Sequence, residues 1–164
     1  MQNNFQSLSY FLPEITIVLT ILFTIISDLV KDLKKYTHKF VMFGLGLTGV
    51  LLFLDSSTSV SKYLFNDMLI FDSVSFYFKC IILLSTFSII MVSKYSLELD
   101  DEYRSEYNTL LLVVLLGMFL MTNSVNLIMI YLSLELVSIP SYVLAGILKN
   151  DKKSNEASLK YVIF

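Results

Sequence analysis

The sequence predicts an all-α, polytopic membrane helix bundle with five full transmembrane helices and the start of a sixth. Hydrophobic residues make up 55% of the 164 residues, charged residues make up 16%, and the mean hydropathy is +0.71. Soluble domains are about 45–50% apolar and about 25% charged, so both values indicate a membrane protein. The apolar residues also occur in long runs bounded by charges, and the joining segments differ strongly in their Lys and Arg content.

The apolar runs predict the spans, because a hydrocarbon core of about 30 Å needs about 20 helical residues. The runs cover residues 10–27, 40–54, 74–93, 108–122, 126–148 and, as an incomplete sixth, 157–164. The second run is short, and we expect Tyr36 and Lys39 to extend it by snorkelling. Residues 62–73 are too short to span and predict a hairpin or a short amphipathic piece. A single membrane domain over residues 1–164 follows.

Lys and Arg predict the orientation of the bundle. If the N-terminus lies outside, the inner loops (31–39, 94–107 and 149–156) carry nine Lys or Arg, whereas the outer segments carry only Lys62. This distribution is the positive-inside pattern of membrane proteins.

Composition disfavours several classes of function. The net charge of −2 provides no basic surface for nucleic acid. A single cysteine, Cys80, and a single histidine, His38, argue against a disulfide, a haem or a metal site within the chain. Phe 13 and Tyr 10 against Gly 5 and Pro 2 indicate an AT-rich organellar or endosymbiont genome. Residues 1–9 contain no Lys or Arg, which argues against a cleaved targeting peptide.

Three glycines in the second run match a nucleotide-binding pattern by chance. Gly44, Gly46 and Gly49 are spaced as GxGxxG, but that fingerprint requires a strand, a tight turn and then a helix. Inside one unbroken apolar run, small residues instead predict a close contact between helices.

Glu135 is the residue that most strongly indicates a function. It lies nine residues into the run that begins at Asn126, which is about 13 Å deep at helical rise. An ionisable group near the bilayer centre costs at least about 2.5 kcal/mol and marks a functional site by default. At spacing i, i+4, i+7 and i+11 its helix carries a polar stripe, the Glu135 stripe, which consists of Tyr131, Glu135, Ser138 and Tyr142. We expect this stripe to face the bundle interior.

Pro140 strengthens this interpretation. It has no N–H, so the carbonyl of Leu136, next to Glu135, loses its helical donor. Interrupted helices at membrane depth are tolerated where they line a wet cavity. We therefore expect Glu135 to handle a proton beside a cation, because alone and desolvated it would be neutral. The alternative is a protonated side chain that bonds between helices and has no role in transport.

Two lysines, Lys160 and Lys79, lie inside the predicted runs. Lys160 is about 5 Å from the inner side and Glu135 about 20 Å, so we expect no direct pair. Lys160 is a candidate for proton entry or relay, with interfacial anchoring as the alternative. Lys79 is interpreted as snorkelling to the outer surface. Glu14 follows Pro13, and both suit a helix N-terminus.

The chain from Glu106 onward resembles a known family. The stretches GMFLMTNSVNLIMIYLSLELVSIPSYVLAG and SNEASLKYVIF are similar to the antiporter-like subunits of respiratory complex I. The form LELVSIPSYVLAG with EASLKY, and the opening FLPEI, are most similar to subunit 2 of the mitochondrial enzyme and to its bacterial counterpart, subunit N. The resemblance implies the N-terminal portion of a larger antiporter-like fold.

The same resemblance implies a membrane-arm subunit of proton-translocating NADH:ubiquinone oxidoreductase that contributes part of a proton channel. In that family the glutamate that matches Glu135 lies beside a lysine of a later, broken helix. The lysine of EASLKY, here Lys160, lies near the inner entrance. Flavin and iron–sulfur clusters are expected in other subunits, with no cofactor and no redox chemistry in this chain.

Expected partners are lipid, other membrane subunits of complex I and a second chain. The second chain would supply the remaining helices of a split subunit, because this sequence ends within its sixth run. The expected location is the mitochondrial inner membrane with the Lys-rich loops in the matrix, or a bacterial plasma membrane. Two alternatives stay open: a subunit of a bacterial cation/proton antiporter, and a structural membrane scaffold without transport.

Overall fold

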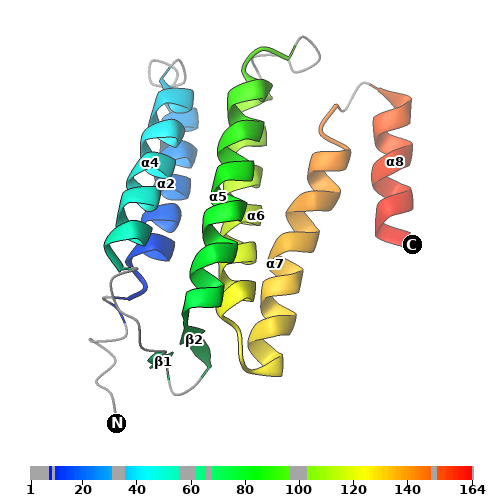
Figure 1. Ribbon diagram of the computed structural model, residues 1–164. Helices are drawn as coiled ribbons and strands as arrows, with labels where there is room; N and C mark the ends of the chain where they lie inside the picture. The colour runs from blue at the N-terminus through cyan, green and yellow to red at the C-terminus, as the bar shows by residue number, and fades with distance from the viewer. Residues whose placement is uncertain are drawn as a thin grey trace.

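The computed structural model describes residues 8, 10–30, 36–55, 62–65, 68–96, 103–148 and 151–163. The element order is α2 (Leu12–Leu29), α4 (Thr37–Asp55), β1 (Lys62–Leu64), β2 (Leu69–Phe71), α5 (Ser73–Ser93), α6 (Arg104–Asn123), α7 (Leu127–Ala145) and α8 (Lys152–Ile163). The long helices run alternately up and down, with the two strands at the lower end, which we call the hairpin end (Figure 1).

Five helices, α2, α4, α5, α6 and α7, are long and apolar enough to cross a membrane. This confirms the predicted helix bundle. The short second run becomes a full-length helix of 19 residues because α4 begins at Thr37 and includes His38 and Lys39. The sixth helix, α8, begins at Lys152 rather than at residue 157 and has 12 residues, none of them buried. It packs against α7.

The predicted hairpin is present at residues 62–71. Strands β1 and β2 pair antiparallel, with Tyr63 opposite Ile70, and Phe65 in the connection adopts a left-handed backbone with φ of 51°. Leu69 forms an isolated bridge with Ser124, and the Val125 N–H donates to a hairpin carbonyl at 3.2 Å. The hairpin is therefore attached to the turn between α6 and α7.

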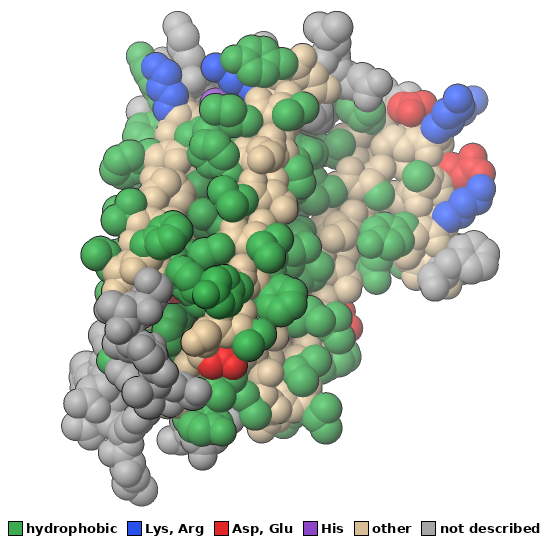
Figure 2. Space-filling model, viewed as in Figure 1, with side chains coloured by type: hydrophobic (Ala, Val, Ile, Leu, Met, Phe, Trp, Pro, Cys, Tyr) green, Lys and Arg blue, Asp and Glu red, His purple; other side chains and the backbone are tan. Residues whose placement is uncertain are grey.

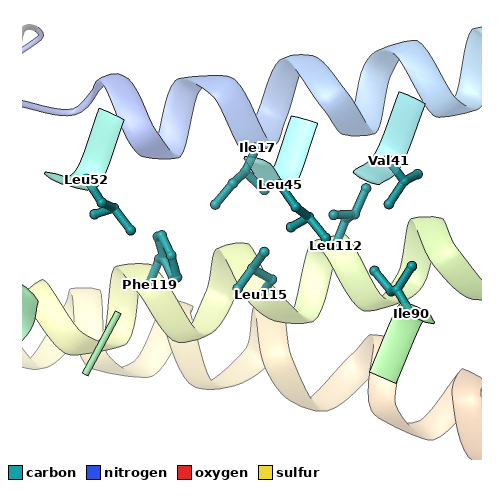
Figure 3. Close-up of a cluster of buried hydrophobic side chains, with 8 residues drawn as sticks. All are labelled: Ile17, Val41, Leu45, Leu52, Ile90, Leu112, Leu115 and Phe119. Carbon is teal, nitrogen blue, oxygen red and sulfur yellow. The ribbon is translucent and has the colours of Figure 1, made fainter. Parts of the chain in front are cut away.

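The apolar core is arranged around α6. Its buried members are Ile17 of α2, Val41, Leu45 and Leu52 of α4, Ile90 of α5, and Leu112, Leu115 and Phe119 of α6. Figure 3 shows the side chains of α2 and α4 on one side and those of α6 on the other, pointing toward one another. Helix α6 also packs on α5 and α7, so it holds the bundle together.

Two glycines allow helices to approach at backbone distance. A Cβ on Gly44 would lie 2.0 Å from Thr20 Cγ2, which shows how closely α4 crosses α2. A Cβ on Gly117 would lie 2.7 Å from Val137 Cγ2 and 3.1 Å from Val137 N, so α6 and α7 are in equally close contact. The predicted glycine contact is thus confirmed at Gly44, while Gly46 has no atom within 4 Å of the added Cβ.

The outer surface between the two ends is apolar. Many large hydrophobic side chains are exposed, and Figure 2 shows them over the length of the helices, with Lys and Arg at the upper end and along α8. Such a surface suits lipid, where a helix satisfies its own backbone polar groups. Parts of the predicted inner loops (31–35, 97–102 and 149–150) lie outside the described residues.

Replacing Gly117 with Ala should destabilise the contact between α6 and α7. The added methyl group would overlap the side chain and backbone of Val137, and overpacking of this kind costs about 1–3 kcal/mol. We expect a lower thermal midpoint for the intact protein in detergent or nanodiscs. Gly46→Ala is the matched control, because its methyl group meets nothing and Ala improves helix propensity. An unchanged midpoint for Gly117→Ala would contradict the close contact.

Candidate functional site

The Glu135 stripe lies on the side of α7 that faces away from α6. The side toward α6 is marked by Ser133 and Pro140, which are buried, and by Val137, which contacts Gly117. Because successive residues of a helix turn by about 100°, Glu135 lies roughly opposite these residues. Within the described helices the stripe therefore faces outward, in contrast to the expected interior position.

The side chains of the stripe make few contacts with other helices. Tyr131 is 61% exposed, and its phenol interacts with the neighbouring Glu135 carboxylate. The Ser138 hydroxyl donates to a backbone carbonyl one turn earlier at 2.7 Å. Tyr142 packs edge-on against Tyr161 of α8, with the ring centroids 5.0 Å apart. Helix α8 thus covers the stripe near Tyr142 and not at Glu135.

Pro140 lies inside α7, which continues without a break to Ala145. Because Pro has no N–H, the helix omits one main-chain hydrogen bond there, to the carbonyl of Leu136. The omitted bond is next to Glu135, as expected. A carboxyl group and a weakened stretch of helix therefore lie at the same level of α7.

Lys160 lies on α8 and pairs with Glu156 of the same helix, with Nζ and Oε1 2.6 Å apart. Both side chains are about two-thirds exposed. The adjacent Tyr161 packs against Tyr142, which is seven residues and about 10 Å along α7 from Glu135. The structure does not bring Lys160 to Glu135, in agreement with the expected absence of a direct pair.

A second group of polar side chains is buried near the hairpin end of the bundle. Glu14 of α2, Lys79 of α5 and Asn123 of α6 are each 0% exposed. Lys79 Nζ donates to Glu14 Oε1 and forms an ion pair with it. Asn123 Nδ2 donates to the same oxygen at 3.3 Å. We call these three residues the Glu14 cluster.

The interpretation of Lys79 as a snorkelling residue is therefore wrong. Its ammonium group lies inside the bundle, 5.5 Å from the ring centroids of Phe71 in β2 and Phe119 in α6. Desolvated cation–π contacts contribute about 2 kcal/mol. Glu14 does lie in the first turn of α2, after Pro13, but it is also the partner of a buried cation. Pairing lowers the cost of burying the two charges.

Local hydrogen bonds set Lys79 and Asn123 in place. Asp72 caps α5 by accepting from the Ser75 N–H at 2.7 Å. The hydrogen bonds from Ser75 lower the pKa of the Asp72 carboxyl group, which lies outside the membrane helices. The Ser75 hydroxyl donates to the carbonyl of Thr122 at 2.9 Å. This bond joins the first turn of α5 to the last turn of α6.

Two buried acceptor atoms of the cluster have no hydrogen-bond partner among the described residues. They are Glu14 Oε2 and Asn123 Oδ1. An unpaired buried polar atom costs about 1–3 kcal/mol. The Glu14 cluster therefore has unused capacity to accept a proton or a hydrogen bond from water.

An apolar layer, formed largely by the hairpin, lies between the cluster and the end surface of the molecule. Leu64, Leu69 and Phe71 are buried there, and Tyr10, Phe11, Phe65 and Met129 pack against them. The rings of Phe11 and Phe65 meet edge-on at 5.4 Å. The hairpin thus acts as a cover over the Glu14 cluster.

The sequence contains a signal for this cluster. Glu14 is the one charged residue in run 10–27, and Lys79 is the one charged residue in run 74–93. Each lies about one turn from the predicted outer end of its run, so an acid and a base occur at the same depth. Asn123 has no such signal, because it lies just beyond the end of run 108–122. No group of three or more His, Cys, Asp or Glu in the described part of the chain could hold a metal ion.

Removing one partner of the buried pair should lower the free energy of unfolding far more than removing both partners. Lys79→Met leaves the Glu14 carboxylate buried without a cation, and breaking such pairs costs about 3–5 kcal/mol. The double variant Glu14→Gln/Lys79→Met should recover most of this loss, measured as the free energy of unfolding of the intact protein. Lys39→Met, at an exposed lysine, is the control. Additive losses in the double variant would contradict a direct ion pair.

Comparisons with known proteins match this chain to bacterial membrane subunits. Residues 124–164 match the family described as NADH:quinone oxidoreductase/Mrp antiporter, transmembrane. These residues include Glu135, Pro140 and Lys160, whereas the Glu14 cluster lies outside them.

Several curated relatives are similar over longer stretches. NADH-quinone oxidoreductase subunit N 2 of Sorangium cellulosum (strain So ce56) is 38% identical over 99% of this chain and 34% of its own length. Subunit N of Chlorobium chlorochromatii (strain CaD3) is 33% identical over 96% of this chain and 31% of its own length. Subunit N of Anaeromyxobacter sp. (strain Fw109-5) is 41% identical over 63% of this chain and 20% of its own length.

The chain spans between about a fifth and about a third of the length of these relatives. Five membrane-crossing helices, the match over residues 124–164 and the similarity to subunit N agree with one another. Together they show that this chain is similar to part of subunit N of NADH-quinone oxidoreductase, with the membrane helices of the antiporter-like family.

Proposed function

We propose that this chain forms part of a membrane-arm subunit of proton-translocating NADH:quinone oxidoreductase. The observation that carries the proposal is the Glu135 carboxyl group, which lies near the middle of a membrane-crossing helix within the matched residues 124–164. An ionisable residue at that depth is costly and is kept for ion or proton handling. Glu135 then holds and passes a proton, and the rest of the stripe provides hydroxyl groups along its path.

In this proposal, the cation that pairs with Glu135 comes from outside the described helices. The stripe faces away from α6, and Lys160 is engaged with Glu156 about 10 Å further along the bundle axis. The outward side of α7 is therefore the surface where further helices pack and supply a lysine. Lys160, on the exposed face of α8, serves proton entry from the inner side.

The further helices belong to the remaining two thirds of a protein as long as the relatives. In a split subunit a second polypeptide carries them; a continuation of this polypeptide is the other arrangement. A denaturing gel of the purified complex distinguishes the two. A companion chain with the remaining helices supports the split subunit, and a single chain about three times this length contradicts it.

The enzyme-level activity is NADH:quinone reduction coupled to proton translocation. In the proposal, the flavin and iron–sulfur clusters belong to other subunits, and this chain takes part through protons alone. Its partners are other membrane subunits of complex I and lipid. The composition supports the mitochondrial inner membrane with Lys-rich loops in the matrix, whereas the relatives named above are bacterial and support a bacterial plasma membrane.

A second candidate function is a subunit of a cation/proton antiporter. The description of the matched family includes the Mrp antiporter, so the matched residues alone do not separate the two functions. Transport that depends on sodium would favour the antiporter. A purely structural scaffold is the third reading, and it requires no role for Glu135.

Glu135→Gln should lower proton translocation by the intact complex by at least about tenfold, because a positioned acid–base group contributes about 10²–10⁴-fold to proton transfer. The complex should still assemble, since Gln keeps the size of the side chain. The measurement is the number of protons translocated per NADH oxidised, in proteoliposomes.

The matched control is Glu106→Gln, the same chemical change on an exposed side chain in the first turn of α6. It should leave translocation close to that of the unmodified complex. Unchanged translocation in Glu135→Gln would support the scaffold and overturn the proposed role of Glu135.

A further inference from the structure

We propose that the Glu14 cluster is a second proton-exchange site, near the hairpin end of the bundle and separate from the Glu135 stripe. In this site a proton moves between Lys79 Nζ and Glu14 Oε1, which are joined by a hydrogen bond. The inference rests on the proposed function, because it assigns the site to the same proton path. The residues of this second site belong to α2, α5 and the end of α6, and they lie outside the matched residues 124–164.

Stability alone does not account for a charged pair in this position. Replacing a buried ion pair by apolar residues of similar volume is often neutral or stabilising, because two charges lose their hydration. Glu14 and Lys79 are both completely buried, in helices whose other neighbours are mostly apolar. Ionisable groups inside a membrane protein commonly mark the path of an ion or a proton.

The ends of two helices hold the charged form of the pair. Glu14 lies in the first turn of α2, where the helix dipole favours a negative charge. Asn123 is the last residue of α6, and the carbonyl end of that helix favours the positive charge of Lys79. The rings of Phe71 and Phe119 add cation–π contacts to the ammonium group.

The cluster can also hold the neutral form of the pair. In the transfer, one N–H bond of the Lys79 ammonium breaks and an O–H bond forms on Glu14, so no net charge is created. Asn123 now donates its amide N–H to the carboxylate. Turned over, the same amide can accept from the carboxylic acid through its oxygen, because an amide presents both kinds of group. The two unpartnered acceptors, Glu14 Oε2 and Asn123 Oδ1, provide places for that proton or for water.

The hairpin controls access to the cluster from the outer side. Phe71 of β2 contacts the Lys79 ammonium, and β2 also forms a bridge with Ser124, next to Asn123. Displacing the hairpin would remove a cation–π contact from the ammonium group and admit water, which gives the proton a route to the outer side. Helix α6 carries Asn123 and also packs on α7 at Gly117, opposite Val137 and two residues from Glu135. The two sites therefore share one rigid helix.

The test uses the intact complex in proteoliposomes and the double variant Glu14→Gln/Lys79→Met, which retains the volume of both side chains without charge. Thr24→Val is the matched control, since Thr24 is a buried polar residue of α2 that meets α6 at Thr109, 3.3 Å away. We expect the double variant to assemble and oxidise NADH but to lose most of its proton translocation. The control should translocate normally.

Infrared difference spectra of the complex, with and without NADH, provide a second readout that does not depend on translocation. We expect a C=O band of a protonated carboxylic acid that is lost in Glu14→Gln and shifted in Glu14→Asp. The same band should persist in Glu135→Gln. The aspartate variant keeps the acid and serves where the glutamine variant does not assemble.

Normal translocation in the double variant, or spectra that are the same in all Glu14 variants, would overturn the inference. Such a result together with a loss of translocation in Glu135→Gln would leave the proposed function standing. Conversely, a complex in which Glu135→Gln translocates normally and the double variant does not would overturn the role of Glu135 and retain the Glu14 cluster.

Discussion

Hydrocarbon cannot solvate charge, and this constraint organises the bundle. Three charged side chains lie within membrane-crossing helices well away from the Lys-rich end: Glu14, Lys79 and Glu135. Glu14 and Lys79 form an ion pair within this chain, inside a cover of aromatic and aliphatic side chains. Glu135 interacts with the phenol of Tyr131 on its own helix. In the proposed function further helices complete its surroundings, because a charge left in lipid is too costly to keep.

Helix α6 connects the parts of the structure that bear on function. It contributes three of the eight buried core residues, ends at Asn123 in the Glu14 cluster, and touches α7 at backbone distance through Gly117. Close approach through small residues packs the two helices tightly against each other. One helix, α6, thus contacts both the Glu14 cluster and the helix that carries Glu135.

The helices could be predicted from the sequence because spanning a bilayer requires a long apolar run, and such runs are visible without any tertiary contact. The starts of α4 and α8 differ from the predicted runs, because helices extend into flanking polar residues that hydropathy counts as loops. The close contact at Gly44 followed from the same reasoning about small residues.

The Glu14 cluster was not predicted, because it joins residues 65 positions apart in the sequence, and pairing across helices depends on which faces meet. The position of the Glu135 stripe on the side of α7 away from α6 depends on the same choice of faces. A polar stripe shows that one face of a helix differs from the others, but it does not show which neighbour covers that face. Here the face toward α6 is made of Ser133, Val137 and Pro140 instead.

A density map of the intact complex at a resolution that shows ordered water is the most direct measurement. A proton-handling Glu135 requires a lysine ammonium group or a chain of ordered water within hydrogen-bond distance of its carboxyl group, supplied from outside the helices described above. Acyl chains packed against the Glu135 stripe, with no cation and no water beside the carboxyl group, would contradict a role in proton transfer.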